Sequence, residues 1–107
     1  MKTKYALVTG GSRGIGKAIA KQIAKDLGCH ILITYVHNDE AAAQTKAEIE
    51  AETDASCETL KFDVANRNET QNVLDKWQED HPDSIIEVIV NNAGVTRDGL
   101  FMAMSEN

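Results

Sequence analysis

Four short apolar runs rich in β-branched residues, separated by longer stretches of helical periodicity, constrain the fold of this chain more than any other feature. The runs cover residues 6–9, 30–35, 58–62 and 85–90. Each segment between them is long enough to return as a helix to the start of the next strand, so the alternation predicts an α/β protein with βαβ units around a parallel sheet. The first and last runs contain almost no polar residue, and we expect both at the centre of the sheet.

The stretch after the first run has the periodicity of an amphipathic helix lying on a sheet. Its large apolar residues recur every four positions, and lysines occupy the other side. We therefore expect the apolar set to face the sheet. Gly28 follows and can adopt the left-handed conformation that ends a helix. The apolar set is Ile15, Ile19, Ile23 and Leu27.

Two further helices are predicted from their first residues. One begins at residue 38 or 39 and continues through an alanine-rich segment to about residue 52. The other begins at Asn66, which forms with Glu69 an N-x-x-E pattern close to a capping box. Trp77 lies in this helix at helical spacing from other apolar residues, which predicts a core position and not a ligand platform.

Size and charge indicate a single globular domain over residues 1–107. The formal net charge is -6, from 17 acidic and 11 basic residues. An acidic chain without a local cluster of Lys and Arg repels nucleic-acid phosphates and anionic lipids, so we expect neither a nucleic-acid nor a membrane partner. The sequence shows neither a signal peptide nor an apolar stretch long enough for a membrane span, and we expect a cytoplasmic protein.

The spacing of cysteines and histidines does not favour a metal site. Cys29 and Cys57 lack C-x-x-C spacing, which favours packed free thiols. His37 and His81 fall in predicted loops without companions at ligand spacing, which favours surface positions. We therefore assign no metal-binding residue.

The segment TGGSRGIGKA, residues 9–18, contains two overlapping phosphate-binding patterns. One is a dinucleotide-type glycine turn formed by Gly10, Gly14 and Gly16. The other is most of a nucleoside-triphosphate loop, which requires a hydroxyl directly after its lysine to bind Mg²⁺. Ala18 occupies that position, and its methyl group cannot coordinate a metal. The sequence therefore favours the dinucleotide turn.

The place of this turn between a strand and a helix suits a pyrophosphate. Helix N-termini offer unpaired N–H groups and the positive end of the helix dipole. Gly10 would allow the tight turn, Gly14 the close approach of a phosphate, and Gly16 the packing of the helix against the strand. Glycine turns also occur for structural reasons alone, so the motif by itself leaves that alternative open.

The end of the second strand indicates which dinucleotide is bound. NAD-specific sites place a carboxylate there to accept the ribose 2′-hydroxyl. Here the strand ends in Thr-Tyr-Val-His, and Asp39 and Glu40 come later. Arg13 lies in the glycine turn, where a guanidinium can pair with a phosphate; a solvent-facing position is the alternative. Both features favour the 2′-phosphate of NADP(H) over NAD.

Three motifs, in this order and spacing, closely resemble those of the classical short-chain dehydrogenase/reductases. They are TGGSRGIG from residue 9, DV at residues 63–64 and NNAG at residues 91–94. The segment VTRDGLFMAM, residues 95–104, is similar to the 3-oxoacyl-[acyl-carrier-protein] reductases and the related acetoacetyl-CoA reductases. The resemblance covers the whole chain. It implies the N-terminal half of a Rossmann-type doubly wound parallel sheet, with strand order 3-2-1-4 and flanking helices, truncated before the catalytic half.

The resemblance also implies contacts with NADP(H). The residues of the glycine turn that would contact the adenosine phosphates and pyrophosphate are Gly10, Ser12, Arg13, Gly14, Ile15 and Gly16. Tyr35 would lie near the ribose, and Asp63 and Val64 would hold the adenine. The residues that would line the ribose and nicotinamide side are Asn91, Ala93 and Gly94. Asn92 would help to fix the strand.

Family members use a serine, a Tyr-x-x-x-Lys pair and a further asparagine for catalysis, and all of these would lie beyond residue 107. We therefore assign no catalytic residue in this chain. Tyr5 and Tyr35 are followed four places later by Thr9 and Asp39, not by lysine. Both tyrosines fit packing positions in strands.

The implied function is that of the cofactor-binding part of a reductase of fatty acid biosynthesis. Its substrate would be a 3-oxoacyl thioester carried by acyl carrier protein or coenzyme A. The chain alone is expected to be inactive, because carbonyl reduction also needs a proton donor for the developing alkoxide. The alternatives are a noncatalytic nucleotide-binding or oligomerisation module, and an acetoacetyl-CoA reductase or other short-chain reductase. With only one neighbour for the run at residues 85–90, we expect a homo-oligomer or pairing of that edge with another chain.

Overall fold

The computed structural model describes residues 2–10 and 14–92, in which strands and helices alternate. In chain order the elements are β1 (Thr3–Val8), α1 (Gly14–Leu27), β2 (His30–Tyr35), α2 (Asp39–Glu52), β3 (Cys57–Lys61), α3 (Arg67–Asp80) and β4 (Ser84–Val90). All strands are parallel and lie in the order β3-β2-β1-β4. The α/β class and the strand order are confirmed.

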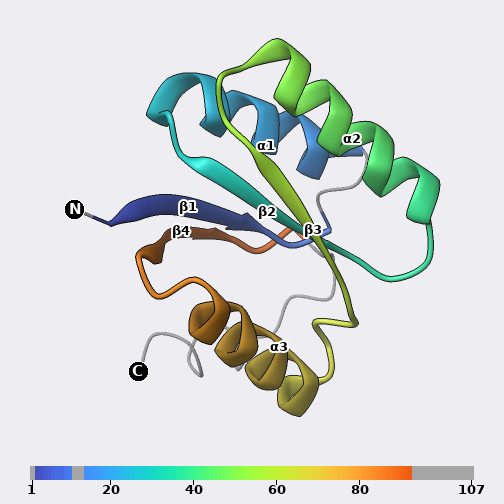
Figure 1. Ribbon diagram of the computed structural model, residues 1–107. Helices are drawn as coiled ribbons and strands as arrows, with labels where there is room; N and C mark the ends of the chain where they lie inside the picture. The colour runs from blue at the N-terminus through green and yellow to red at the C-terminus, as the bar shows by residue number, and fades with distance from the viewer. Residues whose placement is uncertain (1, 11–13, 93–107) are drawn as a thin grey trace.

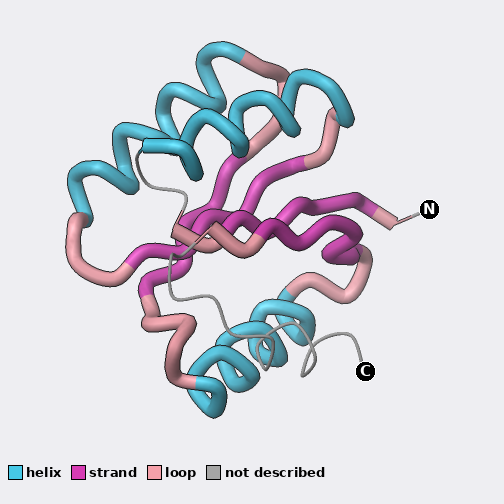
Figure 2. Tube along the Cα trace, turned by 180° about the vertical axis from the view of Figure 1, so that it is seen from behind, coloured by secondary structure: helices cyan, strands magenta, loops and turns pink. Residues whose placement is uncertain are grey.

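The helices cover both faces of the sheet (Figure 1). α1 and α2 lie side by side on one face, and α3 lies on the other. The view from behind shows the same three layers, with the sheet between the helices (Figure 2). Because every strand runs in the same direction, all carboxyl ends meet at one edge of the sheet, where α1 and α2 begin.

The two strands predicted at the centre of the sheet have different positions. β1 lies between β2 and β4, as its apolar sequence predicts. β4 pairs only with β1 among the described residues and is therefore an edge strand in this part of the chain. Its Ile85 is 42% exposed.

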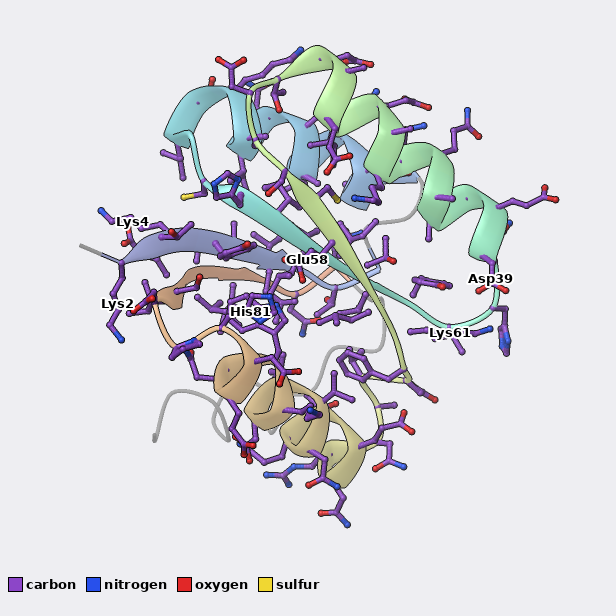
Figure 3. All side chains as sticks on the ribbon, viewed as in Figure 1. Lys2, Lys4, Asp39, Glu58, Lys61 and His81 are labelled. Atoms are coloured by element: carbon purple, nitrogen blue, oxygen red, sulfur yellow. The ribbon has the colours of Figure 1, made fainter. Side chains whose placement is uncertain are left out.

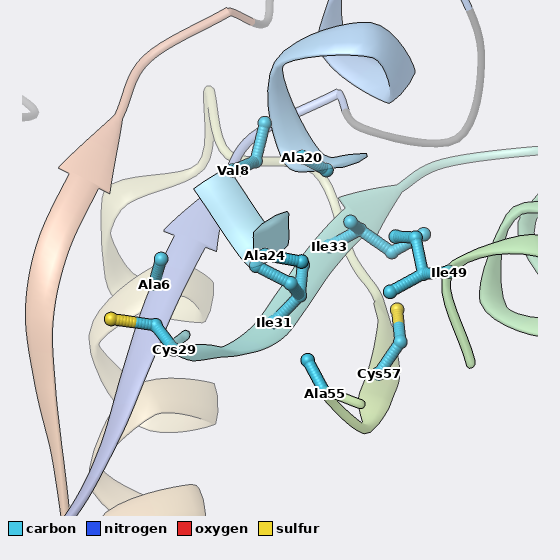
Figure 4. Close-up of a cluster of buried hydrophobic side chains, with 10 residues drawn as sticks. All are labelled: Ala6, Val8, Ala20, Ala24, Cys29, Ile31, Ile33, Ile49, Ala55 and Cys57. Carbon is cyan, nitrogen blue, oxygen red and sulfur yellow. The ribbon is translucent and has the colours of Figure 1, made fainter. Parts of the chain in front are cut away.

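The larger core lies between the sheet and the α1–α2 layer. It contains Ala6, Val8, Ala20, Ala24, Cys29, Ile31, Ile33, Ile49, Ala55 and Cys57 (Figure 4). Cys29 and Cys57 are buried free thiols, as predicted. Burial raises the pKa of the Cys57 thiol to about 12, so this group stays protonated and unreactive near neutral pH.

The face of α1 that meets the sheet differs in part from the prediction, since Ile23 packs against the core but the ends of the predicted stripe do not. Its buried residues are Gly16, Ala20 and Ala24, whereas Ile15 is 71% exposed and Leu27 is 60% exposed. Small side chains let the helix approach the sheet closely. The four-residue spacing of the large apolar residues drifts around the helix by about 40° per step, so it does not define one buried stripe.

The predicted starts of α2 and α3 are confirmed by their caps. Asn38 Oδ1 accepts the Ala41 N–H at 2.9 Å, and Asn66 Oδ1 accepts the Glu69 N–H at 3.0 Å. Glu69 departs from the capping-box pattern, because its side chain accepts the Asp63 N–H at 2.9 Å instead of the N-cap N–H. This contact anchors the loop between β3 and α3.

A second core lies between the sheet and α3 and includes a polar centre. Trp77 is 4% exposed, which confirms its predicted core position. Its Nε1–H donates to Glu58 Oε1 at 3.2 Å, and the Tyr5 hydroxyl donates to Glu58 Oε2 at 3.2 Å. His81 stacks on Trp77 with 4.4 Å between ring centroids. His81 is therefore partly buried and not the surface residue that its loop position predicts.

Candidate functional site

A cavity of about 570 Å³ opens at the carboxyl ends of the strands. Its walls come from the turn after β1, the end of β2 and the loop that follows, the segment after β3, and the segment after β4. Open parallel α/β sheets bind ligands at this edge, and the volume is typical of small-molecule sites. The lining residues are Gly10, Gly14, Thr34, Tyr35, Val36, His37, Asn38, Phe62, Val64 and Asn92.

The glycine turn forms one wall of the cavity. Gly10 and Gly14 both have a φ of 65°, a conformation that is strained for residues with a Cβ. The Gly10 N–H donates to Thr34 Oγ1 at 3.1 Å and thereby links the turn to β2. Gly14 is the first residue of α1, so the positive end of the helix dipole lies at this wall. The wall is therefore suited to a phosphate.

Gly16 allows α1 to pack against the turn. A Cβ added there would collide with the Gly10 carbonyl oxygen and would lie 2.5 Å from Asn92 Nδ2. The Gly10 oxygen belongs to the backbone and cannot move without disturbing the turn. The close helix–strand packing assigned to this glycine from the sequence is present in the structure.

Thr9 connects the ends of β1 and β4. Its hydroxyl accepts the Asn92 N–H at 2.8 Å and donates to Asn91 Oδ1 at 3.1 Å. Asn91 Nδ2 is buried and has no hydrogen-bond partner within the described part of the chain. A buried amide without an acceptor is uncommon and is the kind of group that a bound ligand satisfies.

Apolar residues after β3 form the opposite wall. Phe62 and Val64 line the cavity, and the Phe62 N–H donates to the Tyr35 carbonyl at 3.0 Å. Asp63, between them, does not line the cavity, and its Oδ1 accepts the Ala65 N–H at 2.9 Å. This wall offers an apolar surface to a planar ring, while the Asp63 side chain stabilises the loop.

The end of β2 carries a charged contact beside the cavity. The Tyr35 hydroxyl donates to Asp39 Oδ1 at 2.9 Å, and Lys61 Nζ lies 3.1 Å from the same oxygen. The Tyr35 hydrogen bond and then the Lys61 ammonium lower the pKa of Asp39, and the Asp39 carboxylate raises the pKa of Tyr35. Asp39 is therefore a paired carboxylate at neutral pH.

The predicted cofactor residues fall into four groups. Gly10, Gly14, Tyr35 and Val64 line the cavity. Gly16, Asn91 and Asp63 support its walls, and Ile15 is exposed on α1. Ser12, Arg13, Ala93 and Gly94 lie outside the described residues.

The sequence did not predict five of the cavity residues, which are Thr34, Val36, His37, Asn38 and Phe62. Thr34 is the polar residue near the end of an otherwise apolar strand, and that position is a usable signal. Phe62 directly precedes the Asp-Val motif, and His37 lies two residues after the end of β2. Asn92, expected only to fix the strand, also lines the cavity.

No three His, Cys, Asp or Glu side chains in residues 2–10 and 14–92 form a group that could hold a metal ion. None of the described helices has the length and hydropathy required to cross a bilayer. The glycine wall, the apolar wall and the buried Asn91 amide instead fit a dinucleotide.

A family model described as short chain dehydrogenase matches residues 4–107. The chain belongs to the short-chain dehydrogenase family. The 3-oxoacyl-[acyl-carrier-protein] reductase FabG of Staphylococcus aureus is 38% identical over 104 residues, which cover 97% of this chain and 41% of that protein. The acetoacetyl-CoA reductase of Paracoccus denitrificans is 39% identical over 102 residues, which cover 95% of this chain and 38% of that protein.

The fold is similar to that of solved members of the family. A short chain dehydrogenase from Burkholderia cenocepacia, crystallised in complex with NADP, superimposes with a TM-score of 0.74 at 41% identity. The match covers 90% of this chain and 38% of that chain. The present chain thus spans about two fifths of the length of the curated relatives that it matches. Its elements correspond to the N-terminal part of the family's Rossmann fold.

Proposed function

We propose that this chain is the NADP(H)-binding part of a short-chain reductase that acts on 3-oxoacyl thioesters. The observation that carries the proposal is the glycine turn at the cavity, with left-handed Gly10 and Gly14 and the closely packed Gly16. The substrate class is supported by the relatives named as 3-oxoacyl-[acyl-carrier-protein] reductase and acetoacetyl-CoA reductase. The thioester carrier is accordingly acyl carrier protein or coenzyme A.

Each wall of the cavity holds a different part of the cofactor. The glycine turn and the first N–H groups of α1 bind the pyrophosphate, and Phe62 and Val64 pack against the adenine. Tyr35, which lines the cavity, would lie beside the adenosine ribose. Asn91, whose buried Nδ2 has no described partner, would lie on the ribose and nicotinamide side. When bound, NADPH supplies a hydride to the 3-oxo carbon, and the product is a 3-hydroxyacyl thioester once its oxygen is protonated.

The charge around the end of β2 supports NADP(H) over NAD. None of the described residues that line the cavity is acidic. A ribose 2′-phosphate therefore meets no carboxylate wall, and an NAD-type acceptor for the 2′-hydroxyl is missing from this lining. Arg13 in the glycine turn is the proposed partner for the additional phosphate. The NADP complex of the Burkholderia cenocepacia relative supports the same cofactor.

In this proposal the chain by itself binds NADPH but does not catalyse its oxidation. Proton delivery in the family depends on a tyrosine with a lysine four residues later, and Tyr5 and Tyr35 lack that lysine. The Tyr5 hydroxyl is also committed to Glu58, and burial together with the Glu58 charge raises the pKa of Tyr5. A hydroxyl whose pKa is raised is a poor proton donor near neutral pH.

The cofactor assignment is tested by titrating the full chain with NADPH and following nicotinamide fluorescence. Gly14→Ala adds a Cβ at the phosphate wall and should weaken binding by about tenfold or more through lost phosphate hydrogen bonds. Gly28→Ala is the matched control, because Gly28 has a φ of 68° and, like Gly14, open space around its missing Cβ. It lies at the other end of the sheet.

Both variants introduce the same kind of backbone strain, so circular dichroism should report similar losses of stability. Selective loss of NADPH binding in Gly14→Ala supports the proposal. Equal loss in both variants, or a wild-type chain that binds no NADPH, would refute it. Oxidation of NADPH by the chain with acetoacetyl-CoA would refute the proposed inactivity alone.

A second candidate, a noncatalytic module that assembles through its sheet edge, is favoured by the position of β4. Its outer edge is unpaired within the described residues, and Ile85 is exposed beside it. Sedimentation of the chain with and without NADPH separates the two candidates. A defined oligomer whose sedimentation does not change with NADPH and that binds no NADPH favours the noncatalytic module. A chain that binds NADPH favours the cofactor-binding part of a reductase.

A further inference from the structure

Three elements meet in one side-chain contact next to the cavity. Tyr35 is the last residue of β2, Asp39 the first of α2 and Lys61 the last of β3. The Tyr35 hydroxyl donates to Asp39 Oδ1 at 2.9 Å, and Lys61 Nζ lies 3.1 Å from Oδ1 and 3.4 Å from Oδ2. Figure 3 shows Asp39 and Lys61 beside one another at this end of the sheet. Both carboxylate oxygens are thus engaged within the chain.

The location of this carboxylate gives the contact a functional meaning. An acid close to the end of β2 is what an NAD site uses to accept the ribose 2′-hydroxyl. The Asp39 N–H donates to the His37 carbonyl at 3.1 Å, so a tight bend returns the start of α2 toward the strand end. Tyr35, His37 and Asn38 nevertheless line the cavity, whereas Asp39 does not.

The hydrogen bond from Tyr35 fixes the orientation of the Asp39 carboxylate. Lys61 and Asp39 are 53% and 66% exposed, and an exposed ion pair alone contributes little to holding two flexible side chains. The Tyr35 hydroxyl is carried on a ring at the end of a buried strand and adds a directional bond to the same oxygen. Lys61 balances the charge that a nearby phosphate would otherwise meet.

We infer that Tyr35 and Lys61 are positioning residues that hold the Asp39 carboxylate away from the ribose 2′ position and thereby set a preference for a 2′-phosphorylated dinucleotide. The inference rests on the proposed function, since it requires the cavity to bind the adenosine half of the cofactor. Tyr35 therefore has two roles. It lines the cavity, and its hydroxyl holds the Asp39 carboxylate outside the cavity.

The test measures the affinity of the full chain for NADPH and for NADH, which differ only in the 2′-phosphate. Tyr35→Phe with Lys61→Met frees the Asp39 carboxylate and should lower the NADPH-to-NADH affinity ratio by about tenfold through repulsion of the 2′-phosphate. Tyr35→Phe alone changes no charge and should shift the ratio in the same direction by a smaller factor. Binding is read from nicotinamide fluorescence and needs no catalysis.

Two further substitutions separate position from charge. Asp39→Asn added to the double variant removes the freed carboxylate and should restore most of the ratio. Asp80→Asn added to the same double variant removes one negative charge from an exposed ion pair on α3 and should leave the ratio low. Lys76→Met in the wild-type chain removes the lysine of that exposed pair and should leave the ratio unchanged.

The outcomes distinguish this inference from the proposed function. An unchanged ratio in the double variant overturns the inference while the cofactor assignment stands. Equal rescue by Asp39→Asn and Asp80→Asn also overturns it, because total charge would then decide. A wild-type chain that binds neither nucleotide overturns the proposed function, and the inference with it.

Discussion

The cavity and the polar centre under α3 belong to the same sheet but differ in how their polar groups are paired. At the cavity, two glycines hold left-handed conformations and the buried Asn91 amide has no described partner. Under α3, Glu58 accepts hydrogen bonds from Tyr5 and Trp77 and lies 3.5 Å from His81 Nε2. The Nδ1–H of His81 donates to the Trp77 carbonyl at 2.8 Å.

The difference separates binding from stability. A buried polar group without a partner costs free energy unless a ligand satisfies it, and the surrounding fold must compensate for that cost. The centre under α3 supplies that compensation, because its aromatic rings pack edge-on and stacked around a carboxylate with partners on both oxygens. Substitutions in the two regions should therefore have separable effects on unfolding and on cofactor binding.

Glu58→Ala should show the largest effect on the stable region. It leaves the Tyr5 hydroxyl and the Trp77 indole N–H without their acceptor and should lower the free energy of unfolding by about 1–3 kcal/mol. NADPH affinity should stay within about twofold of wild type, because the cavity lies at the carboxyl ends of the strands and Glu58 does not line it. Urea unfolding and fluorescence titration measure the two quantities.

Glu87→Ala provides the comparison for this prediction. Glu87 pairs with Lys4 at 3.4 Å on β4 and β1, and both side chains are about half exposed. Its loss should change the free energy of unfolding by about 0.5 kcal/mol or less. If Glu58→Ala is no more destabilising than Glu87→Ala, the centre under α3 does not stabilise the fold as described.

A smaller effect is expected where α2 is attached to α1. Glu48 binds Lys17 at 2.8 Å and Lys21 at 2.5 Å, and these lysines lower its pKa from the usual 4.5 to about 2. Because the pKa is lower in the folded chain, the contribution to stability is present above pH 4.5 and is lost as the pH falls toward about 2. Glu48→Gln should therefore be less stable than wild type at pH 6.

The difference between these two proteins should shrink as urea unfolding is repeated at lower pH. Near pH 2 most of the difference between the two free energies of unfolding should be gone, because Glu48 is then about half protonated in the folded chain and almost fully protonated in the unfolded chain. A difference that stays constant from pH 6 to pH 2 would show that the Glu48 charge contributes nothing to the attachment of α1 to α2.

Local sequence signals predicted the elements well because their causes are local. Asn38 and Asn66 are caps whose side chains bond backbone three residues later, and Gly28 ends α1 in a left-handed conformation with a φ of 68°. The strand order, in contrast, was implied by the family resemblance, because no single run encodes which neighbour it pairs with.

Tertiary placement explains the predictions that were wrong. The large apolar residues of α1 suggested a buried stripe, but the close approach of helix and sheet selected the small residues beside them, Gly16, Ala20 and Ala24. His81 was expected on the surface because sequence does not show that Trp77, one helical turn earlier, lies beneath its ring. Polar residues at strand ends, such as Thr34, join the cavity only through the parallel register.

The separation of the two regions is tested most directly by an NMR titration of the isotopically labelled chain with NADPH. The amide signals of Gly10, Gly14, Thr34 and Asn92 should shift with a common saturation curve, and those of Glu58 and His81 should not. The reverse pattern, or shifts spread evenly over both regions, would contradict the assignment of binding to the glycine turn and of stability to the centre under α3.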